Sequence, residues 1–220
     1  QFIRRTWWPD VRFKDGQISG WKAETIGERF REAHVKWSEK TALLDSAEIA
    51  TIQVKTSAGH VCVFHTFGAE VQGPMPFMLS AHATEKEMLT TFATWLELNC
   101  GEGTTLVGWN IKGFDLPRLR LRTVRNAVHL PRVLTGLCGV MDLMKEYARN
   151  WSVERTEFIA LSDALDALGL ENHKKDTDGS MVGELIAAKD YKRLLEYGAQ
   201  DVEKEAEVFQ LMIGRGTLTR

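Results

Sequence analysis

The feature that most constrains the fold is a pair of short segments in which apolar and polar residues alternate. The segments are EIATIQVKT (48–56) and HVCVFHTFG (60–68), both rich in β-branched residues, and Ser57-Ala58-Gly59 separates them. Alternation with a period of two is typical of a strand with one buried face, and a short connection containing Gly is typical of a hairpin. The sequence therefore predicts a β-hairpin over residues 48–68.

Helical periodicity dominates much of the remaining chain. Apolar residues at helical spacing predict an amphipathic helix over 21–40, after an irregular segment at 1–20. A further strand is expected at 104–109. Other helices are expected at 84–99, 116–126, 141–148, 161–168, 180–187 and 190–213. Early strands, later helices and helices between strands predict an α/β fold in which helices flank a mixed sheet, in a single domain spanning 1–220.

Composition narrows the function classes. The chain is 44% hydrophobic with a formal net charge of -2, so a polyanion would need a local basic patch or metal ions for binding. The 3 cysteines form no CxxC pair, which favours neither a disulfide framework nor a zinc site, and we expect a reducing cytoplasm. No apolar run reaches the length of a membrane span. The start at Gln1 leaves open that the chain is part of a longer product.

Two stretches carry residues suited to chemistry. GWNIKGFD (108–115) follows an apolar strand, and a carboxylate at a strand end can be held out toward a substrate. Asp115 also precedes Leu-Pro at a helix start, so an N-cap role stays open. YGAQDVEKEAEVF (197–209) places Tyr197 and Asp201 four residues apart, on one face of the expected helix. The two stretches together are more informative than either alone.

Together these stretches resemble the proofreading-type 3′–5′ exonucleases of the ribonuclease H-like fold, in the branch whose last motif carries a tyrosine, called DEDDy. The chain is most similar to predicted bacterial and phage exonucleases related to the exonuclease domain of family B polymerases. The second motif of that family resembles LVGWNIKGFDLPRLRLR, and the third resembles LLEYGAQDVEKEAEVF. VMDLMKEY, LSDALDALGL and DGSMVGELI follow the expected order of the connecting helices. The resemblance spans about 21–213 and implies a ribonuclease H-like fold with about five strands in a mixed sheet.

The resemblance implies a metal-dependent 3′–5′ exonuclease acting on single-stranded or frayed DNA ends, with DNA favoured over RNA. Two divalent cations, Mg²⁺ or Mn²⁺, would promote hydrolysis, and Asp115 and Asp201 are the candidate ligands. Tyr197 would orient the attacking water. Asn110 is expected to hold the loop or the nucleotide, and Phe114 to pack in the core or stack on a base.

The first motif of the family, Asp-x-Glu at the end of the central strand, is not found in the sequence. Lys22 stands where its Asp would be, two residues before Glu24, and the spacing from Asp45 to Glu48 is one residue too long. The motif is therefore expected upstream of Gln1 or lost, with Glu24 as a partial substitute. Its absence favours the alternative of an impaired exonuclease module that binds nucleic acid or a protein partner.

Basic residues follow the proposed site. Arg118 lies closest to it in sequence and is the candidate substrate contact, although a solvated helix face explains such arginines equally well. The other arginines of this segment are Arg120, Arg122, Arg125 and Arg132. The 173–175 segment, His-Lys-Lys, is expected to lie in a loop and could touch the same strand.

Overall fold

The computed structural model describes residues 47–68, 71, 75–135, 139–152, 158–172 and 181–214. Residues Glu48–Arg220 form one compact unit, and the description below concerns that unit. The expected irregular segment at 1–20, the expected helix at 21–40 and the 173–175 segment lie outside the described residues.

The predicted hairpin is confirmed. Strand β1 (Thr51–Lys55) pairs antiparallel with β2 (Val61–His65). Gly59 in the connecting turn has φ of 90°, a backbone conformation that glycine adopts without steric cost. A third strand, β3 (Met78–Ala81), lies parallel to β2 on its other side and was not expected from the sequence.

A second sheet contains two parallel strands, β4 (Thr105–Gly108) and β5 (Gly139–Asp142). The expected α/β class, with mixed strands and flanking helices, is confirmed. The number of sheets differs from the expectation. The strands of the described segments form separate sheets of three and two strands, and not one sheet of about five. Strand β5 also occupies the start of the segment for which a helix over 141–148 was expected.

The remaining elements are helices, and they agree closely with the expected ranges. They are α3 (Glu85–Asn99), α4 (Asp115–Arg125), the short 3₁₀ helix η2 (Arg132–Leu134), α5 (Leu143–Asn150), α6 (Leu161–Leu168), α7 (Val182–Ala187) and α8 (Tyr191–Gly214). Thr84 caps α3 by accepting a hydrogen bond from the Glu87 backbone N–H. None of the described helices is long and apolar enough to cross a membrane.

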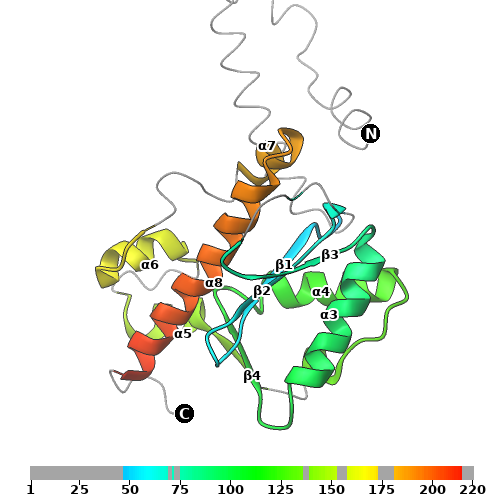
Figure 1. Ribbon diagram of the computed structural model, residues 1–220. Coiled ribbons are helices and arrows are strands. Elements are labelled where there is room, and N and C mark those ends of the chain that lie inside the picture. The colour runs from blue at the N-terminus through cyan, green and yellow to red at the C-terminus, as the bar shows by residue number, and fades with distance from the viewer. Residues whose placement is uncertain are drawn as a thin grey trace, which may run out of the picture. The chain divides into compact units, whose positions relative to one another are not determined.

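Both sheets lie between layers of helices, as the burial of alternate residues shows. Cys62 and Phe64 of β2 pack in one hydrophobic cluster with α3, whereas Val61 and Val63 pack against α8 on the opposite face. Strand β4 also packs against helices on both faces. Leu106 packs in the cluster of α3 and α4, and Val107 packs in the cluster of α5, α6 and α8. Figure 1 shows α8 running across β1 and β2, and α8 also contacts β4. The long C-terminal helix therefore contacts both sheets.

Candidate active site

The loop at 109–114 brings the chain from β4 into α4, and its shape depends on Asn110. Asn110 has φ of 56°, in the left-handed region that Asn tolerates better than most residues. Its carbonyl oxygen accepts hydrogen bonds from the N–H groups of Gly113 (3.0 Å) and Phe114 (2.9 Å). A Cβ on Gly113 would lie 2.3 Å from Asn110 Oδ1, so a larger residue there would displace the Asn110 side chain. Asn110 thus holds the loop, and its contact with a nucleotide stays a prediction.

Asp115 is the first residue of α4 and is exposed to solvent. Phe114 occupies the N-cap position and makes no side-chain cap hydrogen bond, so Asp115 is not the N-cap that the sequence left open. The pKa of Asp115 is raised to about 6, first because the surrounding protein desolvates the carboxylate and further because Asp142 and Asp201 are negatively charged. A bond to its own backbone N–H opposes this rise. Asp115 is therefore within electrostatic range of both other carboxylates.

Asp142, a residue not predicted for the site from the sequence, ends β5 opposite Gly108 in the parallel pairing of β4 and β5. Asp142 is only 3% exposed. One of its oxygens accepts the Lys112 backbone N–H at 3.1 Å, and the other accepts the Lys145 N–H at 3.4 Å and caps α5. The signal in the sequence is an Asp directly after a short apolar run at 140–141. The helix expected over 141–148 covered this position and concealed the end of the strand.

Helix α8 carries the second predicted motif. Tyr197 is 8% exposed and Asp201 is partly buried, and the helix places them one turn apart as expected. Next to Tyr197, α8 approaches β1 closely, because a Cβ on Gly198 would lie 2.6 Å from the side-chain nitrogen of Gln53. The Gln53 amide is itself held by a hydrogen bond to Thr51 Oγ1 at 2.8 Å. A side chain at position 198 would displace either Gln53 or the helix.

The carboxylates suit a hard divalent cation in chemistry but are few in number. Among the described residues, no three His, Cys, Asp or Glu side chains come together as a metal-binding group. Asp115 and Asp201 offer carboxylate oxygens, the donors that Mg²⁺ and Mn²⁺ prefer, whereas both oxygens of Asp142 accept backbone hydrogen bonds. Glu48, one of the first-motif candidates, is exposed, and its Oε1 lies 3.9 Å from Arg122 Nη2. Glu24 and Asp45, the other first-motif candidates, lie outside the described residues.

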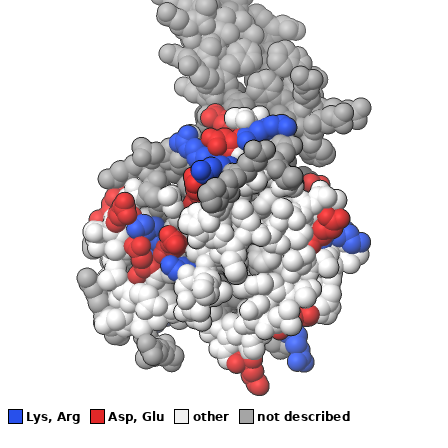
Figure 2. All heavy atoms as spheres, viewed as in Figure 1, with Lys and Arg blue, Asp and Glu red and all other residues white. Residues whose placement is uncertain are grey.

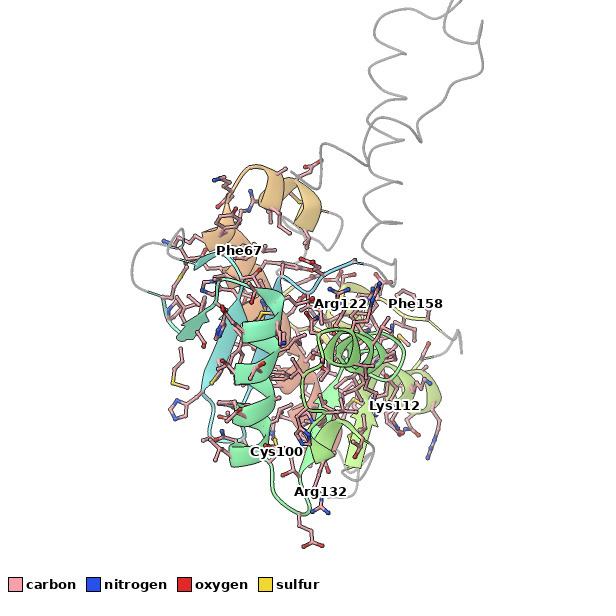
Figure 3. All side chains as sticks on the ribbon, turned by 90° about the vertical axis from the view of Figure 1, so that its right-hand side faces the viewer. Phe67, Cys100, Lys112, Arg122, Arg132 and Phe158 are labelled. Carbon is pink, nitrogen blue, oxygen red and sulfur yellow. The ribbon has the colours of Figure 1, made fainter. Side chains whose placement is uncertain are left out.

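The aromatic and basic candidates divide between the surface and the core. Phe114 is 41% exposed, so the core-packing alternative is wrong, and the Arg118 guanidinium lies 5.8 Å from the centre of its ring. Arg122 is buried against Glu85, and Arg120 donates a hydrogen bond to the Leu134 carbonyl oxygen. Figure 3 shows Arg122 and Arg132 far apart, so these two do not form one phosphate-binding surface.

Charged side chains are also sparse on one broad face of the unit. Figure 2 shows the centre of the face over β1, β3 and α3 without Lys, Arg, Asp or Glu, while acidic and basic groups lie together nearer its margins. The described part of this face therefore presents no broad basic surface for a phosphate backbone. Any contact of this face with nucleic acid would depend on uncharged side chains.

Comparison with known proteins supplies the family. The model of the RNase H superfamily matches residues 53–213, which include nearly all of the two sheets and of α8 and the whole 109–114 loop. No curated protein matches the chain.

Proposed function

This chain belongs to the RNase H superfamily, and on that basis we propose that it is a metal-dependent 3′–5′ exonuclease of the DEDDy branch. Members of the superfamily are usually nucleases that use divalent metal ions, so hydrolysis of phosphodiester bonds in nucleic acid is the activity that membership suggests. The finer proposal is that the substrate is a 3′ end of single-stranded or frayed DNA.

The single observation that carries the proposal is that the fold brings Asp115, at the start of α4, near Asp201 on α8. These carboxylates are 86 residues apart in the sequence, on α4 and α8, and the charge of Asp201 contributes to the raised pKa of Asp115. Carboxylates that repel one another cost stability, a bound cation offsets that cost, and such groups are concentrated at functional sites. A pair of this kind with a tyrosine one helical turn away supports a hydrolytic site.

Each residue has a defined role in the proposed reaction. Asp115 and Asp201 would hold a divalent cation, which when bound lowers the pKa of water and offsets negative charge on the reacting phosphate. The Tyr197 hydroxyl would orient the attacking water by hydrogen bonding, a role that needs no change in its ionisation. Phe114 would stack on a base of the strand, and Arg118 beside its ring would contact a phosphate.

One observation favours a second candidate function, a module that binds nucleic acid or a protein without cutting. The described residues hold no group of three metal-ligating side chains, whereas a two-metal site uses more carboxylates. In this case Phe114 and Arg118 would still contact the strand. Asp115 and Asp201 would then be remnants of a site that no longer holds two cations.

The test is a nuclease assay on a 5′-labelled single-stranded DNA with Mg²⁺ or Mn²⁺. A 3′–5′ exonuclease shortens the labelled strand stepwise from its 3′ end, is inhibited by EDTA and spares a strand with a blocked 3′ end. The double variant Asp115→Asn/Asp201→Asn is the matched control and should be inactive. DNA binding that both proteins share, without cleavage by either, would support the binding module and contradict the exonuclease.

A further inference from the structure

We propose that Asp142 is a positioning residue of this site: its buried carboxylate holds the 109–114 loop, and so places Asp115 relative to α8, without itself binding metal or substrate. This inference rests on the proposed function for its consequence in catalysis. Its structural part, the control of the loop by Asp142, can be tested whether or not the chain is a nuclease.

The two hydrogen bonds of Asp142 join segments that are distant in sequence. The bond to Lys145 is local and caps α5, as an Asp at a helix start commonly does. The bond to Lys112 spans 30 residues and reaches the middle of the loop that leads into Asp115. Capping α5 requires only one carboxylate oxygen of Asp142. The hydrogen bond from the Lys112 N–H to the other oxygen therefore has a separate role.

The loop has few other long-range hydrogen bonds among the described residues. Its local hydrogen bonds run to the carbonyl oxygens of Asn110 and Ile111 and shape the turn without attaching it to the sheet. The Trp109 indole N–H binds the Ile159 carbonyl oxygen at 2.9 Å and fixes the start of the loop. Within the described residues, Asp142 is the long-range hydrogen-bond partner of the part of the loop nearest Asp115, at Lys112.

The burial of Asp142 and its two backbone hydrogen bonds favour a positioning role over that of a direct ligand. The residue is 3% exposed, and each oxygen already accepts a backbone N–H. A charge-assisted hydrogen bond to a backbone N–H in a buried place is strong, and loss of the carboxylate would leave the donor unsatisfied. The Lys112 side chain itself is exposed. The contact therefore depends on the backbone of Lys112 and not on its charge.

The experiment compares Asp142→Asn and Asp142→Ala with Thr84→Ala in the full chain. An Asn keeps one acceptor oxygen and cannot satisfy both N–H groups, which makes it the milder variant. Thr84→Ala removes the cap of α3, so it lowers stability in a similar way without touching the loop. Three quantities are measured: hydrogen exchange of the Lys112 amide by NMR, Mn²⁺ affinity by calorimetry, and kcat and KM on single-stranded DNA.

In both Asp142 variants we expect the Lys112 amide to exchange at least about tenfold faster. Mn²⁺ should bind more weakly, and kcat should fall by roughly ten- to a hundredfold with little change in KM, because a displaced reacting group costs turnover more than binding. Thr84→Ala should reduce the melting temperature and leave all three quantities unchanged. A variant that merely loses stability would resemble Thr84→Ala.

Unchanged Lys112 exchange in Asp142→Asn and Asp142→Ala would overturn the proposal. Weaker Mn²⁺ binding together with unchanged exchange would also overturn it, because Asp142 would then act as a ligand or as a charge. Faster exchange of the Lys112 amide with unchanged Mn²⁺ affinity and kcat would show that Asp142 stabilises the loop but does not position Asp115 for metal binding or catalysis. If the wild-type chain shows no nuclease activity, the proposed function fails, and loop exchange together with Mn²⁺ affinity still decides whether Asp142 positions Asp115.

Discussion

Arg122 and Glu85 form a buried ion pair that joins α4 to the first residue of α3. The side chains are 8% and 5% exposed, and Arg122 Nε donates to Glu85 Oε1 at 2.8 Å while Nη2 bonds the other oxygen. The same carboxylate accepts hydrogen bonds from the Ile49 backbone N–H and the Asn126 amide. A buried charge with this many partners stabilises the packing of two helices, one of which begins with Asp115.

We expect Arg122→Ala to lower the free energy of unfolding by about 3–5 kcal/mol, because Glu85 would be left buried without its cation. Urea denaturation measures this change, and the slope with denaturant should stay the same. Arg132→Ala is the control, since Arg132 is exposed and its loss should change stability by less than about 0.5 kcal/mol. Weaker DNA binding with unchanged stability in Arg122→Ala would instead assign Arg122 to a phosphate.

The same pair predicts a pH dependence of stability. Burial alone would raise the pKa of Glu85, but hydrogen bonds from Arg122, Ile49 and Asn126 and the charge of Arg122 outweigh burial and lower the pKa below 4.5. A carboxyl whose pKa is lower in the folded state stabilises the fold above its unfolded pKa, and this contribution is lost as the pH falls through the folded pKa. The stability difference between wild type and Glu85→Gln should therefore be full at pH 7 and shrink below about pH 4.5. A stability difference between wild type and Glu85→Gln that stays constant below about pH 4.5 would contradict this explanation.

Arg122 also shows why part of the site could not be predicted. Its place among several arginines was equally compatible with a phosphate contact and a solvated helix face, but its partner Glu85 lies 37 residues away in sequence, and no local pattern reveals that pairing. The hairpin, α3 and α8 were predictable because each has a sustained period or a clear cap, and β4 was predictable because its apolar run ends at a glycine before the loop. Strands β3 and β5 have four residues each, too few to show a period. Asp142 was missed together with β5.

Asp115→Ala or Asp201→Ala should reduce nuclease activity by several orders of magnitude while the fold stays intact, because each carboxylate is proposed to hold the cation that offsets charge in the transition state. Activity on single-stranded DNA and circular dichroism together test this expectation. Full activity in either variant would remove that residue from the site.

Metal-free Asp115→Asn should be at least as stable as the wild type at pH 7. The pKa of Asp115 is raised to about 6, first by desolvation, so the folded protein holds this proton more tightly than the unfolded chain does. The wild type accordingly loses stability as the pH rises from about 4 to about 6, and the gain in Asp115→Asn appears over that window. The surrounding protein desolvates the carboxylate only in part, because Asp115 as a whole residue is exposed and water still screens its charge, so the gain should be small. Thermal unfolding in EDTA at pH 4 and pH 7 measures it, and a gain confined to pH 4 would contradict the sign.

Tyr197→Phe should lower kcat by roughly ten- to a hundredfold with little change in metal or DNA binding. The ring of Tyr197 is buried and remains in the variant, so only the hydroxyl is removed and packing is preserved. Single-turnover kinetics separate the chemical step from binding. Normal turnover with weaker substrate binding would show that Tyr197 packs against the strand and does not orient water.

The chain of 220 residues should bind Mg²⁺ or Mn²⁺ weakly, with dissociation constants above about 0.1 mM. Two carboxylates, Asp115 and Asp201, offer too few oxygens to hold two hard cations side by side, and water or substrate phosphates would have to complete the coordination. Calorimetric titration of the wild type beside Asp115→Asn/Asp201→Asn measures the contribution of this pair. DNA should tighten metal binding in the wild type, because its phosphates add oxygen ligands.

Tight metal binding by the wild-type protein alone, with vigorous and EDTA-sensitive cleavage, would mean that further ligands exist. Glu24, with Asp45 or Glu48, would then be the first positions to mutate.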